Sequence, residues 1–295
     1  MSVHVLYTGC LIARRYPGFE AASLFVARKL GFSLEHREGF TCCPDPVWFR
    51  SADQERWLRM AARNLALARS NTEESTTVVA LCNGCFETLK TAQHLLATRQ
   101  EQREKAARFL ASLDLQPPDG VQVKHLVQVI YEDPGPEKLR QQIVRPLEGL
   151  HLAPHPGCHL TRPSAVAQFD DPLKPRVLDE LVEALGARVV TYPNKTQCCG
   201  LPVFVTDREL SLTLAAEKIR RVAEAGAHAL VVTCPSCFQQ FETAQMLDKS
   251  LPRVPVFYYF ELLALALGAA PQEIGLDQHR IKADAVLQRV PALSA

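Results

Sequence analysis

Ten cysteines carry the most specific chemistry in this sequence. They fall into two groups of five, and both groups have the same order of one cysteine, an adjacent pair and a CxxC motif. The members of the two groups are Cys10, Cys42, Cys43, Cys82 and Cys85, and then Cys158, Cys198, Cys199, Cys234 and Cys237. No cysteine lies outside the pattern, which predicts two thiol-rich metal sites rather than scattered free thiols.

The number of thiols in each group restricts the metal that fits. A zinc ion takes four tetrahedral ligands, so it would leave one thiol over, and an adjacent pair is awkward around a single ion. Disulfides would also leave an odd thiol, and residues 1–4 do not have the character of an export signal. Soft thiolates select iron–sulfur clusters, whose several irons suit an adjacent pair. The sequence therefore predicts iron–sulfur ligation by all ten cysteines, and zinc in one repeat stays open as an alternative.

The sequence around the cysteines is repeated as well. Residues 7–10 match residues 155–158, and residues 78–86 around the first CxxC match residues 230–238. Repeats of this length are duplicated domains rather than the units of a solenoid. We therefore predict two domains, residues 1–148 and residues 149–295, the second of which includes a C-terminal tail.

The apolar periodicity predicts that strands and helices alternate in each domain. The expected strands cover 4–8, 32–36, 77–81, 150–153, 188–192 and 229–233, and the expected helices cover 20–30, 51–69, 85–115, 176–185, 206–225 and a segment from 237. Capping boxes that start at Ser51 and Thr206 are expected to open two of the helices. The alternation is typical of a Rossmann-like α/β fold with mainly parallel strands. Four cysteines directly follow strands, so we expect all ten to gather along one edge of the molecule, at the carboxyl ends of the strands.

The composition excludes some classes of function. The chain has 295 residues, 47% of them hydrophobic, and a net charge of +1 from 33 basic and 32 acidic side chains. Because no basic face is concentrated in the sequence, nucleic-acid binding is not expected. The most apolar run, 257–267, contains Glu261 and is expected to be a buried helix rather than a membrane span. We expect a cytoplasmic protein.

Several other residues near the cysteines are candidates for a role in the site. His155 and His159 flank Cys158 and Arg162 follows, so all three are candidate catalytic residues that donate protons or contact an anionic substrate. Simple packing around the site is the alternative. Lys195 is a candidate to offset cofactor charge, with a solvated lysine as the alternative.

The backbone around the cysteines also predicts close support of a cofactor. Both CxxC motifs are expected to open a helix, where free N–H groups and the helix dipole favour thiolates. Glycine has no Cβ, so Gly9, Gly84 and Gly157 are expected to let the backbone approach the cofactor.

At these residues the sequence resembles the CCG-domain (cysteine-rich domain) family, in particular the B subunit of heterodisulfide reductase and its bacterial sulfur-oxidising relatives. The resemblance spans almost the whole chain. The matching segments are Gly9-Cys10, Cys42-Cys43, Leu81–Cys85, Gly157–His159 with Arg162-Pro163, Cys198–Gly200, Cys234–Cys237, Gly275-Leu276 and His279. One position departs from the motif, because Pro44 stands where glycine is usual. Proline has no N–H, so one hydrogen bond to a cluster sulfur is expected to be absent there.

The resemblance implies two non-cubane [4Fe-4S] clusters, each bound by the five cysteines of one domain, with a disulfide or thiol substrate between them. It implies a thiol/disulfide oxidoreductase that works as the catalytic iron–sulfur subunit of a larger heterodisulfide reductase-like complex. Its implied partners are the ferredoxin-like C subunit, the flavin-containing A subunit and, in sulfur oxidation, a sulfur-carrier protein. The alternative is an electron-transferring iron–sulfur subunit of a lactate, glycolate or glycerol-phosphate oxidising complex.

Overall fold

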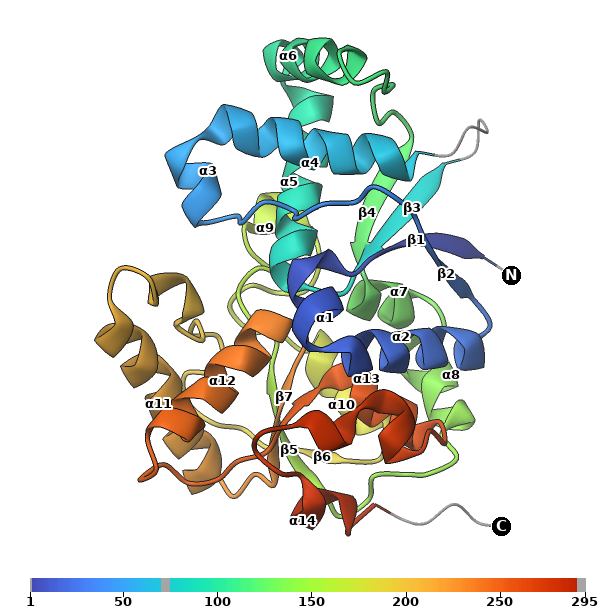
Figure 1. Ribbon diagram of the computed structural model, residues 1–295. Coiled ribbons are helices and arrows are strands. Elements are labelled where there is room, and N and C mark those ends of the chain that lie inside the picture. The colour runs from blue at the N-terminus through green and yellow to red at the C-terminus, as the bar shows by residue number, and fades with distance from the viewer. Residues whose placement is uncertain (1, 70–74, 291–295) are drawn as a thin grey trace.

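Two parallel four-stranded sheets form the framework of the protein, and helices cover their faces (Figure 1). The structure is a computed structural model that describes residues 2–69 and 75–290. The last residues of the second predicted domain, 291–295, lie outside the described residues. The α/β class predicted from the alternation of strands and helices is confirmed.

The first sheet has the strand order β2-β1-β3-β4, and every pair of neighbours is parallel. Its elements are β1 (Val3–Tyr7), α1 (Gly9–Arg15), α2 (Pro17–Leu30), β2 (Ser33–His36), α3 (Trp48–Ala52), α4 (Gln54–Ala68), β3 (Thr76–Ala80), α5 (Asn83–Thr98), α6 (Gln100–Ala111), β4 (Val121–His125), α7 (Leu126–Glu132) and α8 (Gly135–Gln142). The chain adds β2 on one side of β1 and β3 on the other. The carboxyl ends of β1 and β3 therefore form a topological switch point, where open α/β sheets place their sites.

The second sheet repeats this order as β6-β5-β7-β8, again with parallel neighbours. Its elements are β5 (His151–His155), α9 (Ser164–Ala167), α10 (Val177–Ala184), β6 (Arg188–Val189), the 3₁₀ turn η1 (Leu201–Val203), α11 (Arg208–Glu224), β7 (Ala229–Val232), α12 (Pro235–Leu247), β8 (Val256–Tyr258), α13 (Tyr259–Ala266), η2 (Pro271–Ile274), η3 (Leu276–Gln278) and α14 (Asp284–Leu287). Its switch point lies between β5 and β7.

The outer strands β4 and β8 were not predicted from the sequence. In β4, Val121 and Val123 are buried whereas Gln122 is exposed, which is the alternation of a strand with one covered face. The buried run 257–267 was expected to be one helix. Instead β8 extends through Tyr258, and α13 starts at Tyr259. Every residue of both elements is buried, so apolar periodicity carried no signal to separate strand from helix.

The N-cap residues predicted for two helices were wrong by one or two positions. The expected caps were Ser51 and Thr206, but the structure places Asp53 and Asp207 at the N-cap positions of α4 and α11. The Asp53 carboxylate accepts the backbone N–H of Arg56 at 2.9 Å, and Asp207 accepts that of Leu210 at 2.9 Å. A carboxylate at this position satisfies a free N–H and also interacts favourably with the helix dipole.

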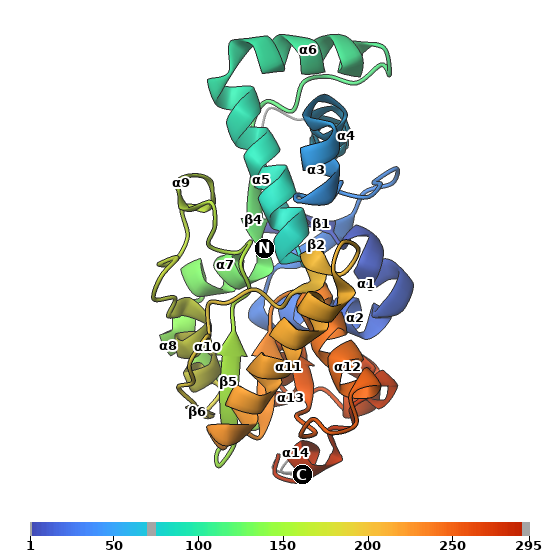
Figure 2. The ribbon, with the colours of Figure 1, turned by 90° about the vertical axis from the view of Figure 1, so that its left-hand side faces the viewer.

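The long helix expected over 85–115 is divided in two. The backbone is extended at Arg99, so α5 ends at Thr98 and α6 starts again at Gln100. The turn brings Ala106 and Leu110 of α6 into the core against α4 and α5. Figures 1 and 2 show α6 at the far end of the molecule from α14. Burial of this apolar face, which a straight helix would leave in solvent, accounts for the break.

The two repeats pack against each other through matching elements. Helix α2 of the first repeat packs on α13 of the second, and α10 of the second packs on α7 of the first. Between α2 and the second sheet, the Phe19 and Tyr258 rings are stacked with centroids 4.4 Å apart. On the other side, the Tyr131 hydroxyl donates to Glu180 at 2.7 Å. Within the described ranges, no helix has the length and apolar character needed to cross a bilayer.

A buried ion pair between Glu261 and His279 predicts a pH dependence of stability. The carboxylate Oε1 lies 2.8 Å from the imidazole Nε2, and both residues are buried. Burial alone would lower the pKa of His279, but the charge of Glu261 and its hydrogen bond outweigh burial and raise the pKa above its ordinary 6.5. The stabilisation is therefore complete below pH 6.5 and is lost as the pH rises through the folded-state pKa.

We expect the free energy of unfolding in urea to fall as the pH is raised above 6.5 and through the folded-state pKa of His279, and the variant His279→Gln to lose this part of the pH profile. Parallel profiles for the natural chain and the variant would show that the pair does not titrate as described.

Candidate cysteine-rich cofactor site

The ten cysteine thiols form one continuous chain of contacts between the two sheets. All ten are free thiols. The Sγ atoms of Cys10 and Cys42 lie 3.9 Å apart, and those of Cys82 and Cys234 lie 3.8 Å apart. Thiol hydrogen bonds complete the order Cys10, Cys42, Cys43, Cys85, Cys82, Cys234, Cys237, Cys199, Cys198 and Cys158. Each group of five is therefore contiguous, and the two groups meet at Cys82 and Cys234.

This position corrects one expectation. The cysteines do follow the carboxyl ends of the strands, but they do not line an outer edge of the molecule. The switch points of the two sheets face each other, so the cysteines lie at the junction of the repeats. Eight of the ten are at least partly buried, and only Cys10 and Cys42 are exposed. Among the described residues, no three His, Cys, Asp or Glu side chains converge in the manner of a site for a single metal ion.

In the first group, a buried polar network fixes the loop of the adjacent pair. The Tyr7 hydroxyl donates to the carbonyl of Thr41 at 2.6 Å. The Asn64 amide accepts the Thr41 N–H at 3.0 Å and donates to the carbonyl of Cys42 at 3.1 Å. Asn64 lies on α4 and is buried. It ties the Cys42-Cys43 loop to the helix layer, and nothing in the sequence pattern pointed to it.

In the second group, a glycine supports the corresponding pair. Gly200 has φ +92°, and a Cβ there would lie 2.5 Å from the carbonyl of Ser211. Its N–H donates to the Cys198 sulfur at 3.4 Å. In the first repeat Pro44 holds the equivalent place and has no N–H to give, so the two sulfur environments differ as the sequence predicts. The Pro44 carbonyl instead accepts the Thr88 hydroxyl at 2.9 Å.

Both CxxC motifs open helices as predicted. Cys82 is the N-cap of α5 and Cys234 is the N-cap of α12, and backbone N–H groups at the start of α12 face the Cys234 thiol. Hydrogen bonds from the Cys237 and Cys82 thiols, assisted by backbone N–H groups, hold the pKa of Cys234 well below its ordinary value. Hydrogen bonds from Cys42 and Cys85 likewise lower the pKa of Cys43 to about 5. The pKa is lowered for one thiol of the first group, Cys43, and for two of the second, Cys198 and Cys234, which favours their anionic, ligating form, whereas it is raised for the other seven thiols.

Two of the three glycines singled out in the sequence leave room for groups of the site. Gly9 has φ +69°, and a Cβ there would lie 2.7 Å from the Cys85 sulfur. Gly157 has φ +77°, and a Cβ there would lie 2.6 Å from the Asn83 amide nitrogen. Gly84 differs, because a Cβ there would make only ordinary contacts at 3.8 Å or more. Close approach therefore explains Gly9 and Gly157 but not Gly84.

Asn83 ties the two groups of cysteines together. It lies inside the first CxxC and is buried. Its amide donates to the carbonyl of Pro156 at 2.7 Å and accepts the Thr233 hydroxyl at 3.1 Å. Pro156 stands two residues before Cys158 and Thr233 directly precedes Cys234. One side chain of the first repeat therefore positions two cysteine segments of the second.

The ends of the outer strands add a second pair of contacts across the junction. The Tyr258 hydroxyl, at the end of β8, donates to the carbonyl of Leu81 just before Cys82. His125 occupies the position in β4 that corresponds to Tyr258 in β8, and it faces the backbone of Thr233. Its Nε2 has no partner at normal hydrogen-bond geometry among the described residues. Each sheet thus contacts the cysteine-bearing strand of the other.

A cavity of about 270 Å³ opens onto the second group of cysteines. Its inner wall contains Cys158, Cys198, Cys199, Cys234 and Cys237. The outer walls come from 45–48 of the first repeat and 201–205 of the second. The Trp48 indole donates to the carbonyl of Pro202 at 2.7 Å and joins these two walls. The cavity gives access to the second group of cysteines, whereas Cys10 and Cys42 of the first group are exposed directly to solvent.

The three candidate catalytic residues have different surroundings. His159 lines the cavity, with Nδ1 3.9 Å from Glu87. His155 is fully buried, and burial followed by the nearby Lys218 charge lowers its pKa to about 3, so its imidazole is uncharged near neutral pH. Arg162 does not line the cavity and donates instead to the carbonyl of Thr196 at 2.7 Å. Only His159 is placed to meet a bound molecule.

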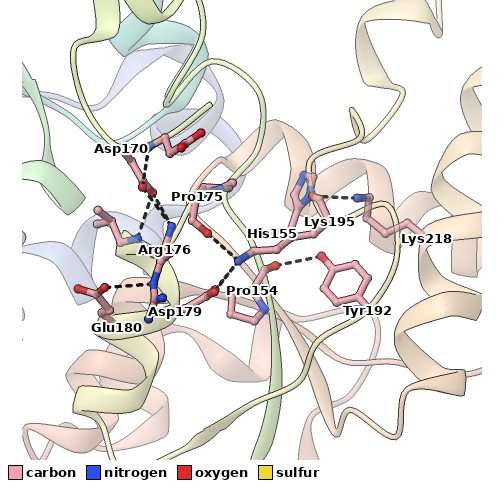
Figure 3. Close-up of polar contacts among 12 residues, drawn as sticks. Pro154, His155, Asp170, Pro175, Arg176, Asp179, Glu180, Tyr192, Lys195 and Lys218 are labelled. Carbon is pink, nitrogen blue, oxygen red and sulfur yellow. Dashed lines mark hydrogen bonds and ion pairs between the residues drawn. The ribbon is translucent and has the colours of Figure 1, made fainter. Parts of the chain in front are cut away.

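The cation near the second group is Lys218 rather than Lys195. Figure 3 shows the Lys195 ammonium held between Asp179 and the carbonyl of Pro175, at 2.6 Å and 2.9 Å. Lys218 is fully buried on α11 and donates to the carbonyls of Asn194 and Lys195. Burial lowers the pKa of Lys218 to about 8, against the opposing effect of the Cys237, Cys199 and Cys198 thiols. Lys218 was not singled out from the sequence, although it is the single lysine of α11 and is spaced to share a helix face with the buried Ala215 and Val222.

The substitution Asn83→Ala is expected to lower the free energy of unfolding by about 1–3 kcal/mol, because it removes two buried hydrogen bonds across the junction and leaves Thr233 and Pro156 only their mutual bond at 3.2 Å. The control Gln93→Ala removes an amide of the same helix that bonds only within the first repeat, to the carbonyl of Val121 at 2.9 Å. Urea unfolding measures both variants. Equal losses would mean that Asn83 is no more than a local helix contact.

Comparison with known proteins agrees with this geometry. The B subunit of the ferredoxin/F(420)H(2)-dependent CoB-CoM heterodisulfide reductase of Methanosarcina acetivorans is 34% identical over 98% of this chain and 97% of its own length. Lactate utilization protein A of Geobacillus thermodenitrificans is 26% identical over 77% of this chain and 84% of its own length. The crystal structure of a hypothetical protein from Helicobacter pylori has the same fold, with a TM-score of 0.75 and 15% identity. This chain spans about half of that protein, since the match covers 95% of this chain and 52% of the other.

The model of the cysteine-rich domain, CCG, matches the sequence twice, at residues 4–90 and 152–242. Each match contains a complete group of five cysteines. The chain is therefore a member of the CCG cysteine-rich domain family.

Proposed function

We propose that this protein is the iron–sulfur catalytic subunit of a heterodisulfide reductase-like complex, which performs thiol/disulfide redox chemistry. The observation that carries the proposal is the contiguity of five thiols in each repeat, at facing switch points. The similarity to the B subunit of a heterodisulfide reductase over nearly the whole chain supports it. We assign Cys10, Cys42, Cys43, Cys82 and Cys85 to one non-cubane [4Fe-4S] cluster and Cys158, Cys198, Cys199, Cys234 and Cys237 to a second.

The donor set of each repeat fits such a group. Five thiols exceed what one tetrahedral ion takes. Backbone N–H groups at the start of α12 face the Cys234 sulfur, and those at the start of α1 face the Cys10 sulfur, where they compensate negative charge. Gly9 and Gly157 supply space that a Cβ would fill. When bound, the clusters would supply single electrons and iron atoms that accept sulfur ligands.

The residues of the chain would bind the substrate, exclude water and supply a proton. Reduction of a disulfide takes up two electrons and two protons and yields two thiols. The walls formed by 45–48 and 201–205 would hold the substrate against the second group of cysteines. His159, which lines the cavity beside Glu87, is the candidate to hold one proton near the departing sulfur.

The electrons would come from partner proteins. The relative is named as the B subunit of its reductase, which describes one component of a larger enzyme. We therefore propose the ferredoxin-like C subunit and the flavin-containing A subunit of such a complex as electron donors in the reducing direction. A sulfur-carrier protein is the proposed substrate partner in the oxidative direction.

A second function is favoured by the lactate utilization relative. In that function the chain would only pass electrons between partners and would not bind a thiol or disulfide. The first function is favoured by the heterodisulfide reductase relative, which is 34% identical over 98% of this chain, against 26% over 77% for the lactate utilization relative.

Anaerobically purified protein is expected to contain about eight iron atoms and about eight sulfide ions per chain, from two four-iron clusters. Oxidation in the presence of a thiol substrate is expected to give an EPR signal that is absent without the thiol. Zinc without sulfide would overturn the assignment of the cofactor. Full iron content with no response to any thiol would favour the electron-transfer function.

A further inference from the structure

A second cavity lies between the two repeats, separate from the cavity that the cysteines line. It has a volume of about 210 Å³, and no cysteine belongs to its lining. Its walls come from the end of α1 and the start of α2 in the first repeat, and from α12, α13 and the segment around η3 in the second. Helix α1 contacts α12, as Figure 1 shows, and α2 contacts η2. Both repeats therefore build one small chamber that the proposed function does not use.

The walls of this second cavity are closely packed. Tyr16, Phe19 and Phe238 form an aromatic wall, in which Phe238 has its ring centroid 4.8 Å from that of Phe19 and 5.2 Å from that of Tyr16. The backbones of the two repeats also approach closely, because a Cβ on Gly18 would lie 2.4 Å from the carbonyl oxygen of Ile274. Packing of this kind fixes the positions of the polar groups that share the lining.

A buried carboxylate faces this cavity with one oxygen unused. Glu242 of α12 lines the cavity and is only 3% exposed. Its Oε1 accepts the backbone N–H groups of Arg280 and Ile281, at 2.9 Å and 3.0 Å. Its Oε2 has no hydrogen-bond partner among the described residues, and it is not sealed off from solvent. Because buried polar atoms are normally hydrogen-bonded, Oε2 is an open acceptor for a molecule in the cavity.

The other acidic side chain of the lining is already engaged. Glu261 pairs through Oε1 with His279 and accepts the backbone N–H of Tyr258 through Oε2, both at 2.8 Å. Burial raises the pKa of Glu242, whereas the backbone N–H groups that it accepts and the charges of His279 and Arg280 oppose this rise. Glu242 is therefore the acidic residue of the lining that has an oxygen to offer a ligand.

Two guanidinium groups belong to the same cavity. Arg15 and Arg280 line it, and both side chains are exposed. Among the described residues, neither guanidinium has an ion pair or a hydrogen bond. The charges of Glu242, Arg280 and Arg15 all act on the hydroxyl of Tyr16, so these groups lie near one another. The cavity thus offers two cationic donors and one acidic acceptor to the same small volume.

We propose that this cavity binds a small zwitterion, with an ammonium group at Oε2 of Glu242 and a carboxylate at the guanidinium groups of Arg15 and Arg280. Arginine side chains donate in pairs to a carboxylate. Aromatic rings such as those of the aromatic wall also favour a nearby ammonium group. A ligand with only one of the two charges would leave either the acid or the arginines without a partner. The inference does not rest on the proposed function, because no cysteine lines this cavity.

Ligand-observed NMR titration of the full chain, purified anaerobically, tests the inference. Glycine, β-alanine and 4-aminobutyrate carry both charges at increasing separation, whereas butyrate and butylamine each carry one. We expect at least one of the three zwitterions to bind about tenfold more tightly than either of the singly charged probes, measured as a ratio of dissociation constants.

Two neighbouring arginines of α1 provide a matched pair of variants. Arg15→Gln removes a charge of the lining, whereas Arg14→Gln removes an exposed charge that does not line the cavity. We expect Arg15→Gln to weaken binding of the zwitterion by about tenfold and Arg14→Gln to leave it unchanged. Glu242→Gln keeps a carbonyl oxygen for the two backbone N–H groups but places an NH₂ group at the open position. It is therefore expected to lose the preference for the zwitterion over butyrate.

Two results with the natural chain would overturn the inference. One is the absence of binding by all three zwitterions at about 10 mM, and the other is binding of butyrate as tight as that of the best zwitterion. Equal losses in Arg15→Gln and Arg14→Gln would reduce the effect to general surface charge and would overturn the placement in this cavity. Iron and sulfide contents test the proposed function independently of all these results.

Discussion

Replacing Gly157 with alanine is expected to remove the second cofactor and to lower the bound iron by about half, because one of two clusters would be lost. The new Cβ would lie 2.6 Å from the Asn83 amide nitrogen, at a backbone φ of +77° that favours glycine. Strain at such a position costs about 1–3 kcal/mol by itself. The clash adds to it by pushing apart the segments that carry Cys158 and Cys82. Metal and sulfide analysis measures the loss.

A matched variant separates the clash from the backbone strain. Gly149 has nearly the same φ of +78°, but a Cβ there would meet nothing within 4 Å. Gly149→Ala is expected to lower stability while keeping all of the iron. Gly9→Ala, whose Cβ would lie 2.7 Å from the Cys85 sulfur, is expected to lose the first cofactor instead. A folded Gly157→Ala protein with undiminished iron would contradict the proposed geometry.

Replacing Lys218 with methionine is expected to lower the reduction potential of the second cluster by about 60 mV or more, which is one tenfold change in a one-electron equilibrium. Lys218 is a fully buried cation whose charge is felt by Cys237, Cys199 and Cys198. A nearby cation stabilises the more negative, reduced state of an anionic cluster. Removal of this charge therefore makes reduction harder. An EPR-monitored redox titration measures the shift.

Lys90→Met is the control for the loss of a partly buried lysine. Lys90 donates to the carbonyl of Val123 at 3.2 Å, and burial lowers its pKa too, but no cysteine contributes to that shift. It is expected to leave both potentials unchanged. If both variants shift the second cluster equally, the effect of Lys218 is a general loss of packing. If only the first cluster shifts in Lys218→Met, the assignment of the charge to the second group is wrong.

The repeated cysteines carried most of the information in the sequence. Because Cys10, Cys82, Cys158 and Cys234 each follow a strand, the sequence placed them at the carboxyl ends of parallel strands, and the structure agrees. The helices that start at the CxxC motifs and the difference between Pro44 and Gly200 could likewise be predicted, since they depend on residues close in sequence.

Contacts between segments that are far apart in the chain could not be predicted from the sequence. Asn83 and Thr233 meet across a separation of 150 residues, which depends on how the repeats pack. Lys218 is the single lysine of α11, but its place near the second group of cysteines depends on tertiary packing. The sequence pattern also suggested an outer edge for the cysteines, because it showed two sheets but not that their switch points face each other. The break at Arg99 has the same origin, since the apolar face of α6 is buried by tertiary packing rather than by local preference.

The contacts across the junction come in reciprocal pairs. Helix α2 contacts α13, and its counterpart in the second repeat, α10, contacts α7. In the same way α1 contacts α12, and its counterpart α9 contacts α5. A shorter ancestral polypeptide with one such half would display both partners of every pair and would close the interface by forming a twofold homodimer. Once two copies are fused in one gene, the two halves no longer need to have identical sequences. Asn83 opposite Pro235, and Pro44 opposite Gly200, are places where the two groups of cysteines in this chain have become unequal.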